Sequence, residues 1–512
     1  MSEISIYSTK DYSYFEEKML KEDIERIYPV SVINDLLEKG NNEYPEKSAV
    51  RWWEGERTYG EVYDDVAHVR YALSKLDLPK GAHIGVLMKN EYAFVKTFFA
   101  AITMGYIFIP IPLTLPPADI IGAVKRLDCK CIMYSTDMAP LANGIRPALG
   151  DVMFVGEEDL DLSSTLPSCQ TSPDDTAIIV FTGGTTGKQK GAMLSQKALL
   201  TCCVYGVYGY ENAFEQSYFA LIPFTHIFGL VRNFLTSYYT ASSIYLCDTP
   251  KNMFRDLPKA APTLMVLVPA LAQMLLGYAK LKGMDAIGGK VKTIICGGAA
   301  VPPALVRACD AAGIALLPGY GLTESANLVS GNGDYLTHPD SVGMPYPGQE
   351  LKFVDGELWL KGDNIMSGYY NAPEENANAF EDGYFKTGDL AKIGEDGLLY
   401  IVGRIKNIII LSNGENVSPE ELEALVNAVP FVQDCLVFEG KNAMDEPTIA
   451  IEVFPNVKAA EAMGIEDIGA AVKDAIININ RNLPSYKQMH LTAVRDTDFE
   501  RNGSMKIIRK YK

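Results

Sequence analysis

Residues 177–191 read Ala-Ile-Ile-Val-Phe-Thr-Gly-Gly-Thr-Thr-Gly-Lys-Gln-Lys-Gly. The apolar run Ala177–Phe181 predicts a buried strand. The remainder holds four glycines, three threonines and two lysines, which supply accessible backbone N–H groups, hydroxyls and positive charge. A strand that ends in such a loop suits a polyphosphate. The residues expected to surround the phosphates are Thr182, Gly183, Gly184, Thr185, Thr186, Gly187 and Lys190.

The loop differs from the common nucleotide-binding patterns. G-x-x-x-x-G-K-[ST] requires Gly at position 182 and Ser or Thr at position 189, where this chain has Thr182 and Gln189. A flexible surface turn is the alternative, but such turns rarely follow an apolar strand with so many threonines. Phosphate binding is the favoured interpretation.

The composition predicts a folded chain of several structural units. With 512 residues the chain is too long for one core, and 48% of its residues are apolar. It has 46 Lys and Arg against 64 Asp and Glu, a formal charge of −18. This balance argues against nucleic acid or an anionic membrane as the main partner, although an anionic ligand needs only local positive charge.

Cysteine and histidine usage favours a reduced protein without a zinc site. Nine cysteines show no framework spacing, and there are five histidines. The start Met1–Ile4 has no signal-peptide pattern. The uncharged run 260–279 approaches membrane length, but its prolines favour a strand, Leu264–Val268, followed by a helix. We expect a soluble, cytoplasmic protein with no transmembrane segment, and the oligomeric state stays open.

Strand and helix patterns alternate along most of the chain. Residues 1–50 have a helical pattern that is expected to stop at Lys39–Asn42. Further on, short apolar strands alternate with helices, which is typical of α/β layers with mostly parallel strands. Two more strands, Val291–Cys296 and Ala315–Pro318, run into glycine-rich loops. Ligands bind at such strand ends in open α/β sheets.

The predicted pattern of secondary structure changes after residue 340. Short strands with turns, including a hairpin at Asp355-Gly356, predict a small β subdomain up to residue 402. Ser418 followed by Pro419 predicts a capped helix start. The last 100 residues alternate strand and helix and predict a small α+β unit.

Six motifs, taken together, resemble one known group of enzymes. Their order and spacing are similar to those of the adenylate-forming superfamily, which contains acyl-CoA synthetases, peptide-synthetase adenylation domains and luciferases. The resemblance covers nearly the whole chain and is strongest to the fatty acyl-CoA ligase branch. The motifs are Thr182–Gly191, Pro223–Leu230, Gly319–Ser325, Tyr384–Asp389, Gly403–Lys406 and Ser504–Arg509.

The resemblance implies an activity and a domain arrangement. An AMP-forming acid–thiol ligase converts a carboxylic acid, here a fatty or aryl acid, to an acyl-adenylate with release of pyrophosphate. It then transfers the acyl group to CoA, so ATP, Mg²⁺ and CoA are implied. The implied fold is α/β: residues 1–404 form a large domain of stacked α/β sheets with the β subdomain, and residues 405–512 form a small mobile α+β domain. Lys406 is the implied hinge.

The same resemblance implies roles at the nucleotide site. Thr323 would bind the α-phosphate, and Glu324 would help to ligate Mg²⁺. Asp389 would accept from the ribose hydroxyls with support from Arg404, and Ile401 would pack nearby. The adenine would lie between residues 298–300 and an aromatic face. The residues implied around it are Gly298, Ala299, Ala300, Gly319, Tyr320 and Gly321.

Each of these residues has a simpler interpretation when it is taken alone. Asp389 would be a turn aspartate, Glu324 a carboxylate at a helix start, and Arg404 a solvated charge. His226 would be a core histidine, whereas the resemblance implies that it positions the carboxylate between the acyl pocket and the thiol entry. The shared order of the motifs favours the functional interpretation.

Lys506 has two interpretations. Five basic residues and no acidic side chain occur after Glu500, which is typical of a solvated basic tail. The resemblance instead implies that Lys506 enters the active site during adenylation and stabilises developing negative charge. Met505 stands where glycine is usual.

The acid and its acceptor remain open at this level. No carboxylate occurs near Pro223–Leu230 to pair a substrate ammonium, and an unpaired buried ammonium would be costly, so an apolar acid is favoured. CoA is the first choice of acceptor, and an acyl carrier protein is the alternative. A binding protein for nucleotide or acyl-adenylate without turnover is a second alternative, and a luciferase-like oxygenase a third.

Overall fold

The computed structural model describes residues 4–182, 190–331, 333–411, 415–441, 447–501 and 507–509. Six of the predicted site residues lie outside these ranges. They are Gly183, Gly184, Thr185, Thr186, Gly187 and Lys506.

A first sheet contains the strand that precedes the glycine–threonine loop. Its strand order is β19-β9-β8-β5-β4-β6-β7. The strands β8, β5, β4, β6 and β7 are parallel, whereas β9 and β19 run antiparallel to their neighbours. The bounds are β4 (His83–Leu87), β5 (Ile107–Pro110), β6 (Cys131–Tyr134), β7 (Met153–Gly156), β8 (Thr176–Thr182), β9 (Lys190–Ser195) and β19 (Gly368–Tyr369).

A second sheet has the order β16-β15-β14-β13-β12-β10-β11-β2-β3, and its central strands are parallel. Both of the other strands with glycine-rich ends, β13 and β14, are neighbours in it. The bounds are β2 (Ser48–Arg51), β3 (Glu56–Thr58), β10 (Ser217–Ala220), β11 (Ser243–Leu246), β12 (Leu264–Leu267), β13 (Thr293–Cys296), β14 (Ala315–Tyr320), β15 (Ser330–Gly331) and β16 (Met344–Pro345).

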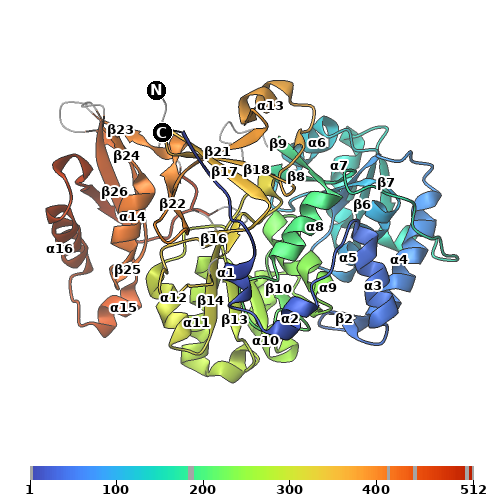
Figure 1. Ribbon diagram of the computed structural model, residues 1–512, viewed down its shortest axis with the longest axis horizontal. Helices are drawn as coiled ribbons and strands as arrows, with labels where there is room; N and C mark the ends of the chain where they lie inside the picture. The colour runs from blue at the N-terminus through green and yellow to red at the C-terminus, as the bar shows by residue number, and fades with distance from the viewer. Residues whose placement is uncertain are drawn as a thin grey trace.

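Helices cover both faces of each sheet (Figure 1). One core, containing Phe98, Val180, Leu199 and Val266, fills the space between the two sheets around α5 and α8. Separate cores lie on the outer faces, under α6 and α7 on the first sheet and under α10, α11 and α12 on the second. The bounds are α1 (Ser13–Glu16), α2 (Lys21–Glu25), α3 (Ile33–Glu43), α4 (Tyr59–Ser74), α5 (Tyr92–Thr103), α6 (Pro117–Arg126), α7 (Ala139–Ile145), α8 (Gln196–Tyr205), α9 (Thr236–Tyr239), α10 (Met253–Ala260), α11 (Pro269–Lys282), α12 (Pro303–Asp310) and α13 (Pro373–Ala379).

The β subdomain forms a third sheet in the order β1-β17-β18-β21-β20, with β22 paired to β21. Asp355 and Gly356 join β17 to β18 with φ values of 49° and 83°, which is the geometry of a tight hairpin turn. The N-terminal segment, expected to be helical, begins instead with a strand that pairs with β17. The bounds are β1 (Ile4–Tyr7), β17 (Gln349–Val354), β18 (Glu357–Gly362), β20 (Phe380–Glu381), β21 (Tyr384–Ile393) and β22 (Leu399–Arg404).

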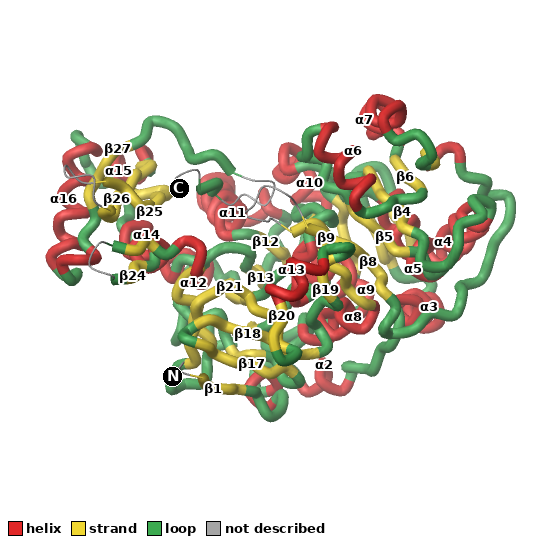
Figure 2. The backbone as a smooth tube through the Cα atoms, turned by 90° about the horizontal axis from the view of Figure 1, so that it is seen from above, coloured by secondary structure: helices red, strands yellow, loops and turns green. Residues whose placement is uncertain are grey.

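The C-terminal elements gather at one end of the molecule, at the left of Figures 1 and 2. A sheet β25-β26-β27 and a short pair β23-β24 pack with α14 and α16 around their own core, which includes Leu422, Val437 and Ile451. The prediction of α/β layers with a large N-terminal and a smaller α+β C-terminal domain is confirmed. The bounds are β23 (Ile409–Ile410), β24 (Asn416–Val417), α14 (Pro419–Asn427), β25 (Val432–Lys441), β26 (Pro447–Pro455), α15 (Val457–Ala462), α16 (Ile468–Arg481) and β27 (His490–Val494).

Two details of the prediction concern helices. The helix expected to stop at Lys39–Asn42 continues to Glu43, because Gly40 lies directly against the Tyr59 ring inside the core. The run 260–279 forms the predicted strand and helix, β12 and α11. No helix within the described ranges combines the length and apolar character needed to cross a bilayer.

Candidate active site

The glycine–threonine loop is held at the ends of an antiparallel strand pair. Thr182, the last residue of β8, pairs with Lys190, the first residue of β9. Thr182 is buried, whereas Lys190 is half-buried and its Nζ lies 4.9 Å from the centre of the Tyr369 ring. The strand and loop ends therefore bring a hydroxyl and an ammonium group to one place.

Glu324 lies beside this pair of strands, in the short turn Thr323–Ser325 (η7) after β14. Its Oε1 accepts a hydrogen bond of 2.8 Å from the Tyr369 hydroxyl. Tyr369 thus contacts both Lys190 of the first sheet and Glu324, which follows β14 of the second sheet. Burial, and then Glu324, raise the pKa of Tyr369, so its hydroxyl keeps its proton. Sequence reasoning missed Tyr369, because it lies outside the six motifs.

The turn that carries Thr323 and Glu324 depends on a close backbone approach. A Cβ on Gly321 would lie 1.3 Å from the Asn327 carbonyl oxygen, so glycine is required there. Ala326 and Asn327 have φ values of 49° and 111°, in the left-handed region that side chains rarely adopt. This backbone sets the direction of the two predicted phosphate and metal residues.

Asp389 lies in β21 and is 3% exposed. The Tyr320 hydroxyl donates to its Oδ2 at 2.6 Å, and Arg404, which faces it across β21 and β22, donates through Nε and Nη2. Burial lowers the pKa of Arg404, but the bond to Asp389 and the charges of Asp389, Tyr320 and Glu324 together outweigh burial, and the net shift is upward. Asp389 is therefore not a turn aspartate, and Arg404 is not a solvated charge.

The remaining predicted nucleotide residues lie around the same strand ends. Residues 298–300 are exposed and follow β13, and a Cβ on Gly297 would lie 3.3 Å from the Gly319 carbonyl oxygen, so the two glycine-rich loops touch. Tyr320 and Ile401 pack against one core of the β subdomain. Burial and the Asp389 carboxylate raise the pKa of Tyr320. The structure thus brings Tyr320, Asp389, Ile401 and Arg404 together.

His226 is half-buried and lies two residues before the start of a π-helix, Phe228–Leu235 (η4), which the sequence did not predict. Its carbonyl accepts from Leu230 N at 2.9 Å. A Cβ on Gly229 would lie within 2.6 Å of the carbonyl oxygens of residues 222 and 223, so glycine lets the helix begin tightly. π-helices often occur at functional sites.

A sequence model of the AMP-binding enzyme family matches residues 37–370, and a model of the C-terminal domain of AMP-binding enzymes matches residues 406–511. The chain belongs to the AMP-binding enzyme family. The predictions of the adenylate-forming superfamily and of an AMP-forming acyl-CoA synthetase as enzyme class are confirmed. The expectation of ATP, Mg²⁺ and CoA, which belongs to this class, is confirmed with them.

The similar proteins include ligases for different acids. The chain is 27% identical over 409 residues to a feruloyl-CoA synthase of Amycolatopsis sp., covering 77% of this chain and 82% of the relative. It is 27% identical over 407 residues to the long-chain-fatty-acid–CoA ligase FadD13 of Mycobacterium tuberculosis, covering 74% and 79%. The crystal structure of the anthranilate CoA ligase AuaEII in complex with anthranoyl-AMP has a TM-score of 0.83 at 22% identity, covering 94% and 96%. The structural likeness confirms the fold.

The residues of this AMP-binding enzyme fit the metal that the family implies. Within the described ranges no group of three or more His, Cys, Asp or Glu side chains could hold a metal ion. Mg²⁺ commonly takes one or two carboxylates together with substrate phosphates, so a complete protein cage is not expected. Tyr369 fixes one oxygen of Glu324, and the carboxylate has a second oxygen available for a cation.

The family's second matched region begins at Lys406, which is exposed in the turn Ile405–Asn407 (η8). Just before it, the Val402 carbonyl accepts from Ser418 Oγ at 2.9 Å. Ser418 was predicted to cap α14, but its side chain makes no cap bond to the helix and instead joins the helix start to β22. Gly403 permits this approach, because a Cβ there would lie 2.2 Å from Ser418 Oγ.

The segments on either side of Lys506 are anchored to the C-terminal domain. Arg501 pairs with Asp434 on β25, and Arg509 pairs with Glu423 on α14 at 2.6 Å. Arg501 and Ile507 form an antiparallel bridge. Burial raises the pKa of Glu423 to about 7, although Arg509 acts in the opposite direction. The interpretation as a solvated basic tail is therefore wrong for Arg501 and Arg509.

Proposed function

We propose that this enzyme activates a fatty or aryl carboxylic acid with ATP as an acyl-adenylate, releases pyrophosphate and transfers the acyl group to CoA. The observation that carries the proposal is that the short segment 320–324 contributes one residue to each of two polar clusters. Asp389, Tyr320 and Arg404 lie on one side, and Glu324, Tyr369 and Lys190 on the other. The first cluster suits a ribose and the second suits metal-bound phosphates.

Each cluster has a chemical role in this proposal. Asp389 pairs with Arg404 and accepts hydrogen bonds from the ribose hydroxyls. Thr323 donates to the α-phosphate, while Lys190, Thr182 and the loop 183–187 bind the departing phosphates. Glu324 would hold Mg²⁺, which neutralises the charge that builds as the phosphate bond breaks. Residues 298–300 and Tyr320 enclose the adenine, with Gly319 and Gly321 leaving room for it and Ile401 packing nearby.

The later residues serve the two half-reactions. Lys506 stabilises the charge that develops on the acyl and α-phosphate oxygens during adenylation. His226 positions the carboxylate near the thiol entry. The domains divide between residues 404 and 405, and rotation about Lys406 exchanges Lys506 for another loop before thioester formation. The enzyme acts in the cytoplasm.

CoA is the proposed acceptor because the relatives described above are named as CoA synthases and ligases. Their printed substrates are a phenolic acid and long-chain fatty acids, which supports the general class of acid. An acyl carrier protein offers the same thiol and is the alternative acceptor.

The test is ATP-dependent pyrophosphate release across acids from C2 to C18, benzoates, cinnamates and amino acids, each with and without CoA. Release that follows one class of acid and multiplies when CoA is added would support the proposal. Release limited to about a single turnover with CoA present would favour a carrier protein. No release with any acid would favour a binding protein without turnover.

The role of Lys506 is tested by separating the half-reactions. Lys506→Ala should abolish pyrophosphate release with the acid, yet retain thioester formation from supplied acyl-adenylate and CoA. Lys458→Ala on the surface of the same domain is the matched control. Equal loss of both half-reactions in K506A would contradict the role.

A further inference from the structure

The segment 364–370 runs from the third sheet to the first and passes the turn that carries Glu324. It leaves β18 at Gly362, and its later residues form β19, which pairs with β9 beyond the glycine–threonine loop. On the way, the backbone N–H of Met366 donates to the Glu324 carbonyl at 2.8 Å. The Tyr369 hydroxyl gives Glu324 a second contact with the same segment. The segment therefore connects the loop proposed to bind phosphates with the carboxylate proposed to hold Mg²⁺.

Asn364 holds the start of this segment against the same turn. Its side chain is fully buried, and Nδ2 donates to the Leu328 carbonyl at 2.8 Å and to Gln349 Oε1 on β17 at 2.9 Å. Leu328 ends the loop that follows Glu324, whereas Gln349 belongs to the third sheet. One amide thus joins the turn of Glu324 to the β subdomain.

The residue directly after Glu324 has two further contacts. The Ser325 carbonyl lies 3.5 Å from Asn364 Nδ2 and 3.3 Å from the Cys202 thiol on α8. A thiol is a weak hydrogen-bond donor. The Asn364 amide is therefore the stronger of the two polar restraints on this turn.

Gln349 fixes the orientation of the Asn364 amide. Gln349 is 2% exposed, and its Nε2 donates to the carbonyls of Val329 at 3.0 Å and Tyr346 at 3.3 Å, which leaves Oε1 to accept from Asn364. Only the NH₂ end of an amide can bond to carbonyl oxygens, so neither side chain can turn over without losing these bonds. The two amides form one rigid pair.

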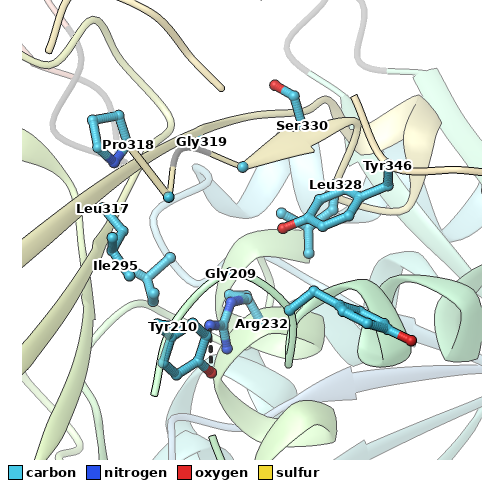
Figure 3. A pocket seen from close by; sticks show the side chains of 13 residues that line it. Gly209, Tyr210, Arg232, Ile295, Leu317, Pro318, Gly319, Leu328, Ser330 and Tyr346 are labelled. Carbon is cyan, nitrogen blue, oxygen red and sulfur yellow. Dashed lines mark hydrogen bonds between the residues drawn. The ribbon is translucent and has the colours of Figure 1, made fainter. Parts of the chain in front are cut away.

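Packing leaves the end of the turn little freedom on its other side. Leu328 and Tyr346 line one side of a pocket, opposite Ile295 and Leu317 (Figure 3). The pocket has a volume of about 30 Å³, which is room for about one water molecule. The Leu328 side chain has little space to move, and its carbonyl is bonded to Asn364, so this end of the turn is held from both sides.

The hydrogen bonding of Asn364 is incomplete, which argues against a role in stability alone. Its Oδ1 is buried and has no hydrogen-bond partner among the residues that the structure describes. A buried acceptor without a partner destabilises the folded state. Asn364 thus loses at Oδ1 part of the stability that it gains at Nδ2, while the bonds of Nδ2 fix the turn.

We propose that Asn364, supported by Gln349, is a positioning residue that sets the place of Glu324 relative to the glycine–threonine loop. This inference rests on the proposed function and extends its metal site. Asn364 acts through the backbone of the turn, and the group that it serves is the Glu324 carboxylate. Groups that orient a metal ligand from outside typically change metal affinity or activity by about 10- to 100-fold when they are removed.

The test compares three variants with a matched control. Asn364→Leu removes every bond of the amide at similar volume, Gln349→Met removes its support, and the third variant combines both changes. The control is Gln196→Leu, because Gln196 is also a buried amide of the large domain and accepts from Ile33 N at 2.8 Å. It directly follows Ser195, which pairs with Thr176 at the ends of β8 and β9 away from the loop.

Two measurements are made on each protein. Pyrophosphate release is followed over a matrix of Mg²⁺, ATP and acid concentrations. Binding of α,β-methylene-ATP, which cannot release pyrophosphate, is measured by calorimetry with and without Mg²⁺. Thermal unfolding without ligand reports stability separately.

We expect N364L to raise both the Mg²⁺ concentration for half-maximal rate and the Kd of the analogue with Mg²⁺ by about 10- to 100-fold, with the KM of the acid changed by less than about twofold. Q349M should shift the same quantities less, because the Leu328 bond of Asn364 remains. The double variant should match N364L, because both changes break one restraint and their effects are not additive. Q196L should lower Tm and leave the Mg²⁺ dependence unchanged.

Two results would overturn the inference. One is a folded N364L whose Mg²⁺ dependence and analogue binding match the wild type. The other is a loss spread equally over Mg²⁺, ATP and acid that follows the fall in Tm, as for a structural amide. If N364L does not fold, Q349M decides by the same measurements. Absence of turnover with every acid would instead refute the proposed function, and the calorimetric binding would still test the role of Asn364.

Discussion

Replacing Tyr369 by phenylalanine removes one contact of this side chain and keeps the other. The lost contact is the 2.8 Å hydrogen bond from the hydroxyl to Glu324 Oε1, and the retained one is the ring beneath Lys190 Nζ at 4.9 Å. A hydrogen bond to a charged group contributes about 1.5–3 kcal/mol, which corresponds to roughly 10- to 150-fold in rate or affinity. Glu324 is half-buried, so the lower part of this range applies.

We therefore expect Y369F to lower kcat/KM for ATP by about 10- to 30-fold and to raise the Mg²⁺ concentration needed for half-maximal rate. Tyr369→Leu should lose a further factor of about 2–5, because it also removes the cation–π contact of about 0.5–1 kcal/mol. The assay is pyrophosphate release over a matrix of ATP and Mg²⁺ concentrations.

The matched control is Tyr370→Phe, whose ring meets His83 edge-on at 4.8 Å on the other side of the strand. Burial and Glu324 raise the pKa of Tyr369, so its hydroxyl stays protonated through alkaline assay conditions. The defect of Y369F should therefore be constant from about pH 6 to 9. A folded Y369F within twofold of the wild type would contradict this role of the Tyr369 hydroxyl.

Two further predictions concern a glycine of the backbone and a buried carboxylate. Gly321→Ala places a Cβ 1.3 Å from the Asn327 carbonyl oxygen, so it should abolish pyrophosphate release and lower Tm. The control Gly277→Ala adds a methyl group in open space on helix α11 and should keep or raise Tm, and wild-type activity in G321A would contradict the prediction. The pKa of Glu423 is raised to about 7 by burial, above its unfolded value, so its contribution to stability is complete below pH 4.5 and is lost as pH rises through 7. Between pH 4.5 and 7, the free energy of urea unfolding of Glu423→Gln should fall with pH less steeply than that of the wild type, by about 1.4 kcal/mol per pH unit. Equal slopes in the two proteins would contradict the raised pKa of Glu423.

The sequence located residues whose neighbours along the chain form a motif. Asp389 and Arg404 were implied by the resemblance of their motifs to the family, and they meet because β21 and β22 pair in register. The buried strand over Ala177–Phe181 was also predicted correctly, since an apolar run acts over a few residues. These features depend on local chemistry, which a single sequence records.

Long-range contacts were not accessible in the same way. Tyr369 reaches Glu324 across 45 positions, and it lies outside the six motifs. Gly40 resembled a helix stop, but packing against Tyr59 overrides its weak helix propensity.

The contacts around Lys406 bear on how one site could serve two half-reactions. Arg501 and Arg509 tie both flanks of Lys506 to β25 and α14, so any displacement of this domain carries that segment with it. The Ser418 bond to the Val402 carbonyl crosses the proposed boundary, and a bond of this kind contributes about 0.5–1.5 kcal/mol. A ligand that binds one orientation of the C-terminal domain more tightly than another can offset an energy of that size. Such a ligand would shift the population from one domain orientation to the other. We infer that the C-terminal domain turns as a unit about the exposed turn at Lys406, because the charge pairs of Arg501 and Arg509 both lie within that domain.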